Sequence, residues 1–399
     1  MWLKNRKKRI DMKSFWYASV ITLALLALTG CSHDDSHDDS HHDSSEGSDK
    51  SFVIEGGVLK TCSKDIQGEF VIPDGVTEIG IDAFNECTSL TKVTIPDSVT
   101  KIGDGAFRDC TSLESVNIPS SVTEIEDCAF AGCTSLTKVT IPDSVTEIGY
   151  AAFSRCTSLA SIDIPSSVAE LSDVLFNECT SLASVTIPDS VTKIGIMAFE
   201  ECTNLANVNI PSSVIEIGDY AFDGCASLTS VMIPDSVIKI GWLAFYGCKN
   251  LASVAIPDNV VEIGRGAFRD CTSLVNVNIP SSVMKIENDM FYWCESLASI
   301  TIPDSIEEIG DNAFRDCKCL ESIEIPGRVT GIGDSAFLGC IGLKKITIPH
   351  SVKRIGNKAF YMCSELTINY AGTKEEWEEI IKDVYIGDYN EINYSVALR

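Results

Sequence analysis

Cysteine and histidine are the residues of this chain whose number and grouping first suggest chemistry. The sequence has 17 cysteines and five histidines, and such side chains bind metals or form disulfides when they cluster. Thirteen of the cysteines, however, recur every 23 residues from Cys87 to Cys363. A strict interval of about 20–29 residues indicates a stacked structural repeat and not a compact metal site.

The regular cysteines have two interpretations. Exported proteins often carry disulfides. The number of regular cysteines is odd, however, and parallel stacking directs their side chains the same way, whereas a disulfide needs facing Cβ atoms. We therefore expect buried thiols that donate weak hydrogen bonds to a turn. The cysteines outside the regular series are the better places for a bridge or a reactive thiol: Cys62, Cys128 and Cys319.

Four of the five histidines lie within residues 33–42, beside several aspartates. Adventitious metal binding is one interpretation of such a tract. The other, which we favour, is a disordered tether over residues 31–50, because the Ser/His/Asp stretch that opens it has no apolar residue and its like charges keep it extended. We predict no metal site and no cofactor.

Catalysis needs convergent ionisable groups in a pocket. The repeat region has one histidine, His350, and no Gly-rich phosphate loop or nucleophile–base pair is visible. Its many serines recur at equivalent positions, which indicates architecture. We therefore predict that the protein is not an enzyme.

The repeating unit is clearest in residues 87–109. Its apolar residues predict a short strand closed by Pro96, a second short extended piece, and one or two turns of helix. In that order the three groups are Leu90, Val93 and Ile95; Val99 and Ile102; and Ala106, Phe107 and Cys110. All 13 prolines and an unbroken series of phenylalanines from Phe84 to Phe360 keep the same interval.

No single unit of this size can bury its apolar residues alone, so the units must stack. We predict an α/β solenoid of 23-residue coils over residues 73–366. Parallel strands add about 4.8 Å per coil, so thirteen coils span on the order of 60 Å.

The pattern Leu-x-x-Val-x-Ile-Pro, x-x-Val-x-x-Ile-Gly, x-x-Ala-Phe, x-x-Cys strongly resembles the BspA-type leucine-rich repeat family of bacterial surface proteins. The resemblance covers residues 66–366 and extends to both ends, where residues 51–72 look like the family's N-terminal capping hairpin and residues 367–399 like its C-terminal cap. It implies a leucine-rich repeat fold and a cell-surface binding protein, with adhesion to host proteins or other cells.

The C-terminal cap is also predicted from its own residues. Thr373 and Glu376 can form a capping box for a short helix. Trp377, Ile380 and Ile381 would close the open end of the core, as terminal repeats must.

Residues 1–30 are predicted to be a lipoprotein signal peptide. Six basic residues precede an apolar run that is too short for a confident membrane span. The run ends in Leu28-Thr29-Gly30-Cys31, which looks like a bacterial lipobox with Cys31 as the lipidated residue; an ordinary signal peptide is the alternative. Met12 is an alternative start to Met1. Acids after Cys31 resemble a surface-export signal, so we expect lipid anchoring in the cell envelope, on the outer membrane at its outer surface.

The chain is strongly acidic, with a formal net charge of −26. Removal of residues 1–30 leaves 25 basic and 56 acidic residues, a net charge of −31. Nucleic-acid binding needs the opposite sign of charge, so we exclude that class of partner.

Two surfaces are candidates for binding. The first is the concave face of the sheet, where small polar residues flank each inward valine or isoleucine; the alternative is that they are only soluble β-formers. Its candidate residues are Asn117, Thr140, Asp163, Thr186, Asn209 and Asn278.

The second is an apolar stripe. Tyr150, Ile196 and Trp242 occupy alternate coils at a place where Asp173 and Asp219 stand between them. Large apolar residues on a polar edge can mark a partner site. The alternative is local packing on the convex side.

Together these features predict a surface-exposed, monomeric lipoprotein that binds an extracellular or cell-surface protein or glycan in adhesion. The alternative is a passive structural or coat protein of the envelope, which would self-associate.

Overall fold

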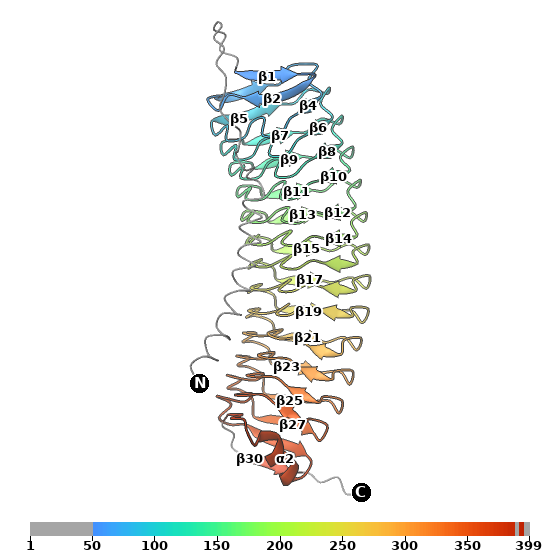
Figure 1. The fold of residues 1–399 in the computed structure, drawn as a ribbon, viewed down its shortest axis with the longest axis vertical. Coiled ribbons are helices and arrows are strands. Elements are labelled where there is room, and N and C mark those ends of the chain that lie inside the picture. The colour runs from blue at the N-terminus through green and yellow to red at the C-terminus, as the bar shows by residue number, and fades with distance from the viewer. Residues whose placement is uncertain (1–50, 388–390, 395–399) are drawn as a thin grey trace, which may run out of the picture. The chain divides into compact units, whose positions relative to one another are not determined.

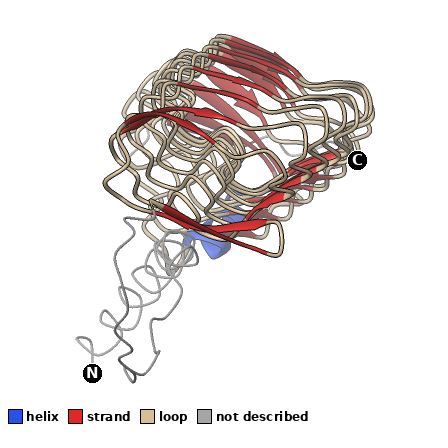
Figure 2. Cartoon of the chain, turned by 90° about the horizontal axis from the view of Figure 1, so that it is seen from above, coloured by secondary structure: helices blue, strands red, loops and turns tan. Residues whose placement is uncertain are grey.

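The computed structural model describes residues 51–387 and 391–394. The predicted signal peptide, Cys31 and the tether lie outside the described residues. The described residues form one compact unit, in which the chain winds into stacked coils that repeat every 23 residues (Figure 1). Each coil has three sides, two built on strands and one built on turns. Figure 2, from above, shows the strands superposed in rows.

The first strand side continues through most of the unit as short parallel strands in register, broken into four sheets. Its strands are β3 (Gly68–Val71), β5 (Leu90–Thr94), β7 (Ser115–Asn117), β9 (Lys138–Thr140), β11 (Ser161–Asp163), β13 (Ser184–Thr186), β15 (Asn207–Asn209), β17 (Ser230–Met232), β19 (Ser253–Ala255), β21 (Asn276–Asn278), β23 (Ser299–Thr301), β25 (Ser322–Glu324), β27 (Lys345–Pro349), β29 (Thr367–Ala371) and β30 (Glu391–Tyr394).

The second strand side is built from two-residue strands, as the second extended piece of the repeat predicted, and begins with an antiparallel hairpin of β1 and β2. Its strands are β1 (Phe52–Glu55), β2 (Val58–Cys62), β4 (Glu78–Ile79), β6 (Lys101–Ile102), β8 (Glu124–Ile125), β10 (Glu147–Ile148), β12 (Glu170–Leu171), β14 (Lys193–Ile194), β16 (Glu216–Ile217), β18 (Lys239–Ile240), β20 (Glu262–Ile263), β22 (Lys285–Ile286), β24 (Glu308–Ile309), β26 (Gly331–Ile332) and β28 (Arg354–Ile355).

The third side consists of turns, and the predicted helix in each coil is wrong. Within the described ranges, α2 (Lys374–Ile381) is the only α-helix. In each of thirteen coils two residues four positions apart have positive φ, such as Gly105 (56°) and Asp109 (55°). Left-handed residues interrupt a right-handed helix. The turn N–H groups therefore bond the next coil, as in Phe107 N–H to Ala129 O at 2.8 Å.

A column of stacked phenylalanines forms the centre of the core. Each of the thirteen lies one coil from the next with ring centroids 4.9–6.0 Å apart, and all are fully buried. Because every coil supplies the same ring at the same place, each ring is buried by the coils above and below it. The core therefore exists only in the stack, as expected for a repeat protein.

The regular cysteines are buried free thiols, as predicted. From Cys110 to Cys363 each Sγ donates to the phenylalanine carbonyl of the preceding coil, for example Cys225 to Phe199 O at 3.2 Å. Burial raises the pKa of these thiols, to about 12 for Cys179 and well above the ordinary value for Cys225. Outside the series, Cys62 is half-buried, Cys319 exposed, and both are free, whereas Cys128 is buried on the turn side.

Glycine follows most of the two-residue strands because adjacent coils approach closely there. A Cβ on Gly241 would lie 2.5 Å from the backbone nitrogen of Asp219 in the preceding coil, closer than real Cβ contacts. Ser172 takes this place after β12, and its hydroxyl donates to Ile148 O. The strand ladder is interrupted between β10 and β12.

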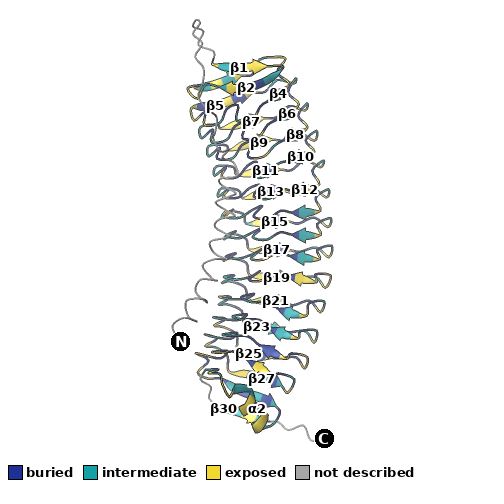
Figure 3. Cartoon of the chain, viewed as in Figure 1, coloured by how far each residue is buried: buried dark blue, intermediate teal, exposed yellow. Residues whose placement is uncertain are grey.

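Both ends of the core are covered. β1 and α2 present exposed residues at the two ends (yellow in Figure 3). The predicted capping box of α2 is confirmed, because Thr373 Oγ1 accepts from Glu376 N–H and Glu376 accepts from Thr373 N–H. Trp377 is buried against Tyr370, with ring centroids 5.2 Å apart. The C-terminal end of the core is therefore covered by residues of the same unit.

We expect Arg155→Gly to raise the free energy of unfolding by about 1 kcal/mol relative to Arg155→Ala. Arg155 is exposed and has a φ of 60°, a conformation that costs a residue with a Cβ but not glycine. Urea unfolding of both variants measures the difference. Both variants lose the same charge, so equal stabilities would show that the left-handed turn is not strained.

Candidate functional site

The residues predicted for the sheet surface lie together on the outward face of the first strand side. Each stands on a strand whose middle residue is buried while its two neighbours are exposed: Asn117, Thr140, Asp163, Thr186, Asn209 and Asn278. They form a polar ladder over successive coils from Asn117 to Asn209, which Met232 and Ala255 interrupt before Asn278.

Part of this ladder is occupied by contacts within the fold. Thr186 Oγ1 donates to Asp163 Oδ1 at 2.6 Å. Asn278 accepts from Ile256 N–H at 2.9 Å and donates to Ile256 O at 2.7 Å, which joins two coils. Asn278 therefore has a structural role that its residue type alone did not reveal.

A shallow hollow of about 380 Å³ lies on the same face, over β19, β21 and β23. Buried Val254 and Val277 belong to its lining, as does the small side chain of Ala255. In the preceding coil the place of Ala255 is taken by Met232, which is 77% exposed. The hollow is thus a local departure from an otherwise uniform face.

The residues of the predicted apolar stripe occupy one column but are not contiguous. Ile196 is 39% and Trp242 44% exposed, whereas Tyr150 is half-buried. Asp173 and Asp219 lie between them and accept the N–H groups of Ile196 and Trp242 at 2.7 and 2.8 Å. The aspartates therefore hold the next coil, and the large residues are separated by two coils each.

A surface with several aromatic and arginine side chains in contact, which we had not predicted, lies on the turn side. The guanidinium of Arg269 lies between the rings of Tyr246 and Tyr292, with its Cζ 5.5 and 4.7 Å from their centroids. The Cζ of Arg315 lies 5.0 Å from the second ring. Trp293 is 44% exposed and its ring centroid is 5.3 Å from that of Tyr292. We call these five residues the aromatic–arginine patch.

The patch is held in place by neighbouring coils. Asp316 accepts from Trp293 Nε1 at 3.1 Å and from Arg315 Nε at 3.4 Å. Cation–π contacts of this kind are worth about 0.5–2 kcal/mol each, depending on solvent exposure. The rings and guanidinium groups of the patch are therefore held in fixed positions before any partner binds. Tyr246, Arg269, Tyr292 and Arg315 follow one another at intervals of one coil.

Two carboxyl groups extend the same column toward the N-terminus. Burial, together with the charges of Glu201 and Glu178, raises the pKa of Glu200 to about 7. Burial and the charge of Glu200 raise the pKa of Asp223 to about 8. Asn177 Nδ2 donates to Glu200 at 2.7 Å. These groups change charge near neutral pH.

Comparison of the coils with one another would have found this column in the sequence. The residue after each core phenylalanine varies widely, from Asn85 and Ala131 to Arg269 and Tyr361, whereas the phenylalanine itself does not change. A position that varies against a fixed repeat distinguishes one coil from another. The sequence therefore held the signal, in the differences between repeats.

Among the described residues, no group of three or more His, Cys, Asp or Glu side chains is placed to hold a metal ion. In the same part of the chain, no helix has the length and apolar character needed to cross a membrane.

The register, the turns and the capped ends define the protein as a leucine-rich repeat solenoid. The repeat described as the BspA type leucine rich repeat region matches residues 60–183, 170–297 and 239–367. The chain therefore belongs to the BspA-type leucine-rich repeat family, as its residues had suggested.

Solved structures agree with this assignment. A leucine-rich repeat protein from Bacteroides ovatus is 30% identical, with a TM-score of 0.68 and coverage of 90% of this chain and 100% of that one. A leucine-rich cell surface protein from Faecalibacterium prausnitzii is 33% identical, with a TM-score of 0.55 and coverage of 85% and 98%. The pneumococcal vaccine antigen PcpA, 19% identical with a TM-score of 0.52 and coverage of 87% and 98%, shares the fold. No curated protein matched the chain.

Proposed function

We propose that the protein is a surface-exposed lipoprotein that binds a protein or glycan partner in adhesion. The observation that carries this proposal is the aromatic–arginine patch. The solved structures that resemble this chain are bacterial leucine-rich repeat proteins, and one of them is a cell surface protein. Lipidation at Cys31 and the 31–50 tether would hold the unit away from the membrane; incorporation of a labelled fatty acid tests the anchor.

The composition of the patch supports partner binding. Tryptophan, tyrosine and arginine are enriched among the residues that dominate interface energies. Arg269 and Arg315 also place positive charge on a chain whose net charge is −26. We therefore expect the partner to present planar or anionic groups, such as a carboxylate-bearing peptide or an acidic glycan.

We expect Trp293→Gly to weaken binding of residues 51–399 to immobilised extracellular-matrix proteins or glycans by at least about tenfold, the loss typical of a hot-spot residue. Trp293 has a φ of 62°, and the equivalent place in other coils is already glycine, as at Gly224 and Gly247. The substitution therefore preserves the turn while it removes the exposed ring. Surface plasmon resonance against each array hit measures the change.

Met362→Gly is the matched control, because Met362 occupies the same place in a coil outside the patch and has a φ of 65°. If the wild-type unit binds an array component and Trp293→Gly binds it equally well, the binding site lies on another face. If no array component binds at all and the unit forms open-ended assemblies, the protein is a structural coat component instead.

A further inference from the structure

The second strand side carries a column of exposed apolar side chains. Its four members occupy one place in successive coils, directly before β16, β18, β20 and β22, where several other coils have threonine. They are Ile215, Ile238, Val261 and Met284, which are 46%, 47%, 62% and 64% exposed. We call them the apolar column. Side chains this large and this exposed mark an interaction surface when they are contiguous.

The backbone makes the column contiguous. Ile238 N–H donates to Ile215 O at 2.9 Å, and Val261 N–H donates to Ile238 O at 2.9 Å. Consecutive members are therefore about 4.8 Å apart, and the column is about 14 Å long. Thr192 and Glu307 bound it on either side.

The neighbouring place in each coil forms a charged column. Over six successive coils the sign of the charge alternates: Lys193, Glu216, Lys239, Glu262, Lys285 and Glu308. Lys239 Nζ lies 3.1 Å from Glu216 within the chain. The midpoint of these six residues falls between Lys239 and Glu262, which is also the midpoint of the apolar column.

We propose that this side binds a second copy of the chain, with the two solenoids antiparallel about a two-fold axis between the coils of Ile238 and Val261. The axis runs along the strand direction, so each column faces itself in reversed order. Ile238 then packs on Val261 of the second copy. Because the alternation has an even number of members, reversal brings Lys239 onto Glu262 and Lys193 onto Glu308.

The charge pattern selects this arrangement. A two-fold axis along the solenoid would instead set the apolar column against the charged column. In the antiparallel arrangement no two like charges of the charged column meet, even further out, where Glu147 faces Arg354. Isologous contacts of this type close on themselves and give dimers, not filaments.

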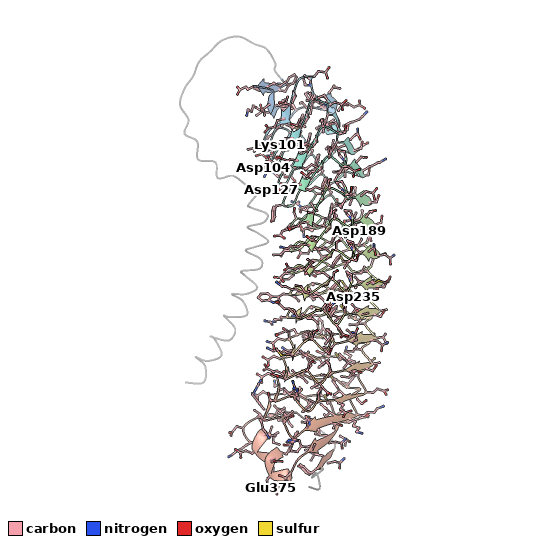
Figure 4. The ribbon with its side chains drawn as sticks, turned by 90° about the vertical axis from the view of Figure 1, so that its right-hand side faces the viewer. Lys101, Asp104, Asp127, Asp189, Asp235 and Glu375 are labelled. Carbon is pink, nitrogen blue, oxygen red and sulfur yellow. The ribbon has the colours of Figure 1, made fainter. Side chains whose placement is uncertain are left out.

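An acidic margin limits the contact at one edge. Figure 4 views this side and labels Asp189 and Asp235 along that margin. The contact covers six coils, about 29 Å at most, so the buried area should lie at the small end of specific interfaces. The dimer is therefore expected to form at micromolar concentrations. A dimer would replace our expectation of a monomer. Because the dimer is closed, it also differs from the open-ended assembly expected of a coat protein.

Sedimentation equilibrium of residues 51–399 tests the dimer. We expect Val261→Asp to raise the dissociation constant at least about tenfold, because each copy would bury an unpaired carboxylate. Thr100→Asp, at the same place in a coil outside the apolar column, should leave it unchanged. A monomer throughout the micromolar range, or equal effects of the two variants, would overturn the proposal.

A charge exchange tests the antiparallel register. Lys239→Glu and Glu262→Lys should each weaken self-association, and a mixture of the two variants should form a heterodimer that is tighter than either homodimer. The double variant should recover the wild-type dissociation constant. Circular dichroism confirms that each variant is folded. Absence of heterodimer preference would rule out the register.

Discussion

Replacement of Phe222 by alanine is expected to lower the free energy of unfolding by about 3–5 kcal/mol. The ring is fully buried, and its centroid lies 5.3 Å from those of Phe199 and Phe245. Loss of the ring leaves a cavity that borders two further rings, and a rigid stack of coils has little freedom to collapse around it. Urea unfolding followed by circular dichroism measures the loss.

The position of Phe222 near the middle of the stack adds a second expected result. Because each coil contacts only its neighbours, a weak interface in the middle uncouples the two halves, and unfolding should lose cooperativity. Phe222→Leu, which keeps most of the volume, should cost much less. Met232→Ala removes an exposed side chain and serves as the surface control. A loss below 1 kcal/mol for Phe222→Ala would contradict a central role for the phenylalanine column.

The second large effect concerns the paired carboxyls Glu200 and Asp223. Their pKa values in the folded protein, about 7 and about 8, lie above the ordinary values of 4.5 and 3.8. Between about pH 4 and pH 8 the folded state therefore holds more protons than the unfolded state, so stability falls as pH rises through this window. Glu200→Gln and Asp223→Asn should each raise the free energy of unfolding at pH 8, by about 1–3 kcal/mol.

The expected gain disappears below about pH 3, where both carboxyls are protonated in the folded and unfolded states. Glutamine at position 200 can still accept the hydrogen bond from Asn177, so the change isolates the charge. Glu147→Gln, on the exposed face of β10, is the matched control and should leave the pH profile unchanged. Denaturant unfolding at several pH values provides the profile, and an unchanged slope in the two variants would refute the raised pKa values.

The capping box was predicted from Thr373 and Glu376 themselves, whereas the 23-residue interval was sufficient to predict the stacking, the inward residues and the buried thiols. These features depend on side chains that recur at fixed places, so the repeat itself identifies them. The helix predicted from Ala106, Phe107 and Cys110 was wrong because their spacing also fits a turn that bonds the next coil. Only six of the 26 left-handed positions in these turns are glycine, so the usual turn residue was mostly absent.

The surfaces were harder to predict because they depend on differences between coils and not on the repeat. Trp242 was identified because it replaces an aspartate, and the sequence already placed Asp219 between it and Ile196. The sequence did not reveal that Asp219 accepts the N–H of Trp242 and so joins the two coils. Arg269 was overlooked because its place between Tyr246 and Tyr292 becomes visible only when the residues that follow each core phenylalanine are compared. Contacts between coils join residues about 23 positions apart. The periodicity therefore predicts many equivalent contacts, but it does not indicate which of them form a binding surface.

The series of buried thiols has a consequence for how the chain folds under oxidising conditions. In the stacked state burial raises the pKa of Cys225 and its neighbours, so the thiolate that attacks disulfides is scarce. Before stacking, the same thirteen thiols have ordinary acidity and can cross-link at random. Each coil that joins the stack withdraws one thiol from oxidation. Protection therefore grows coil by coil with folding itself, and the speed of stacking relative to oxidation decides how much of the chain reaches the native state.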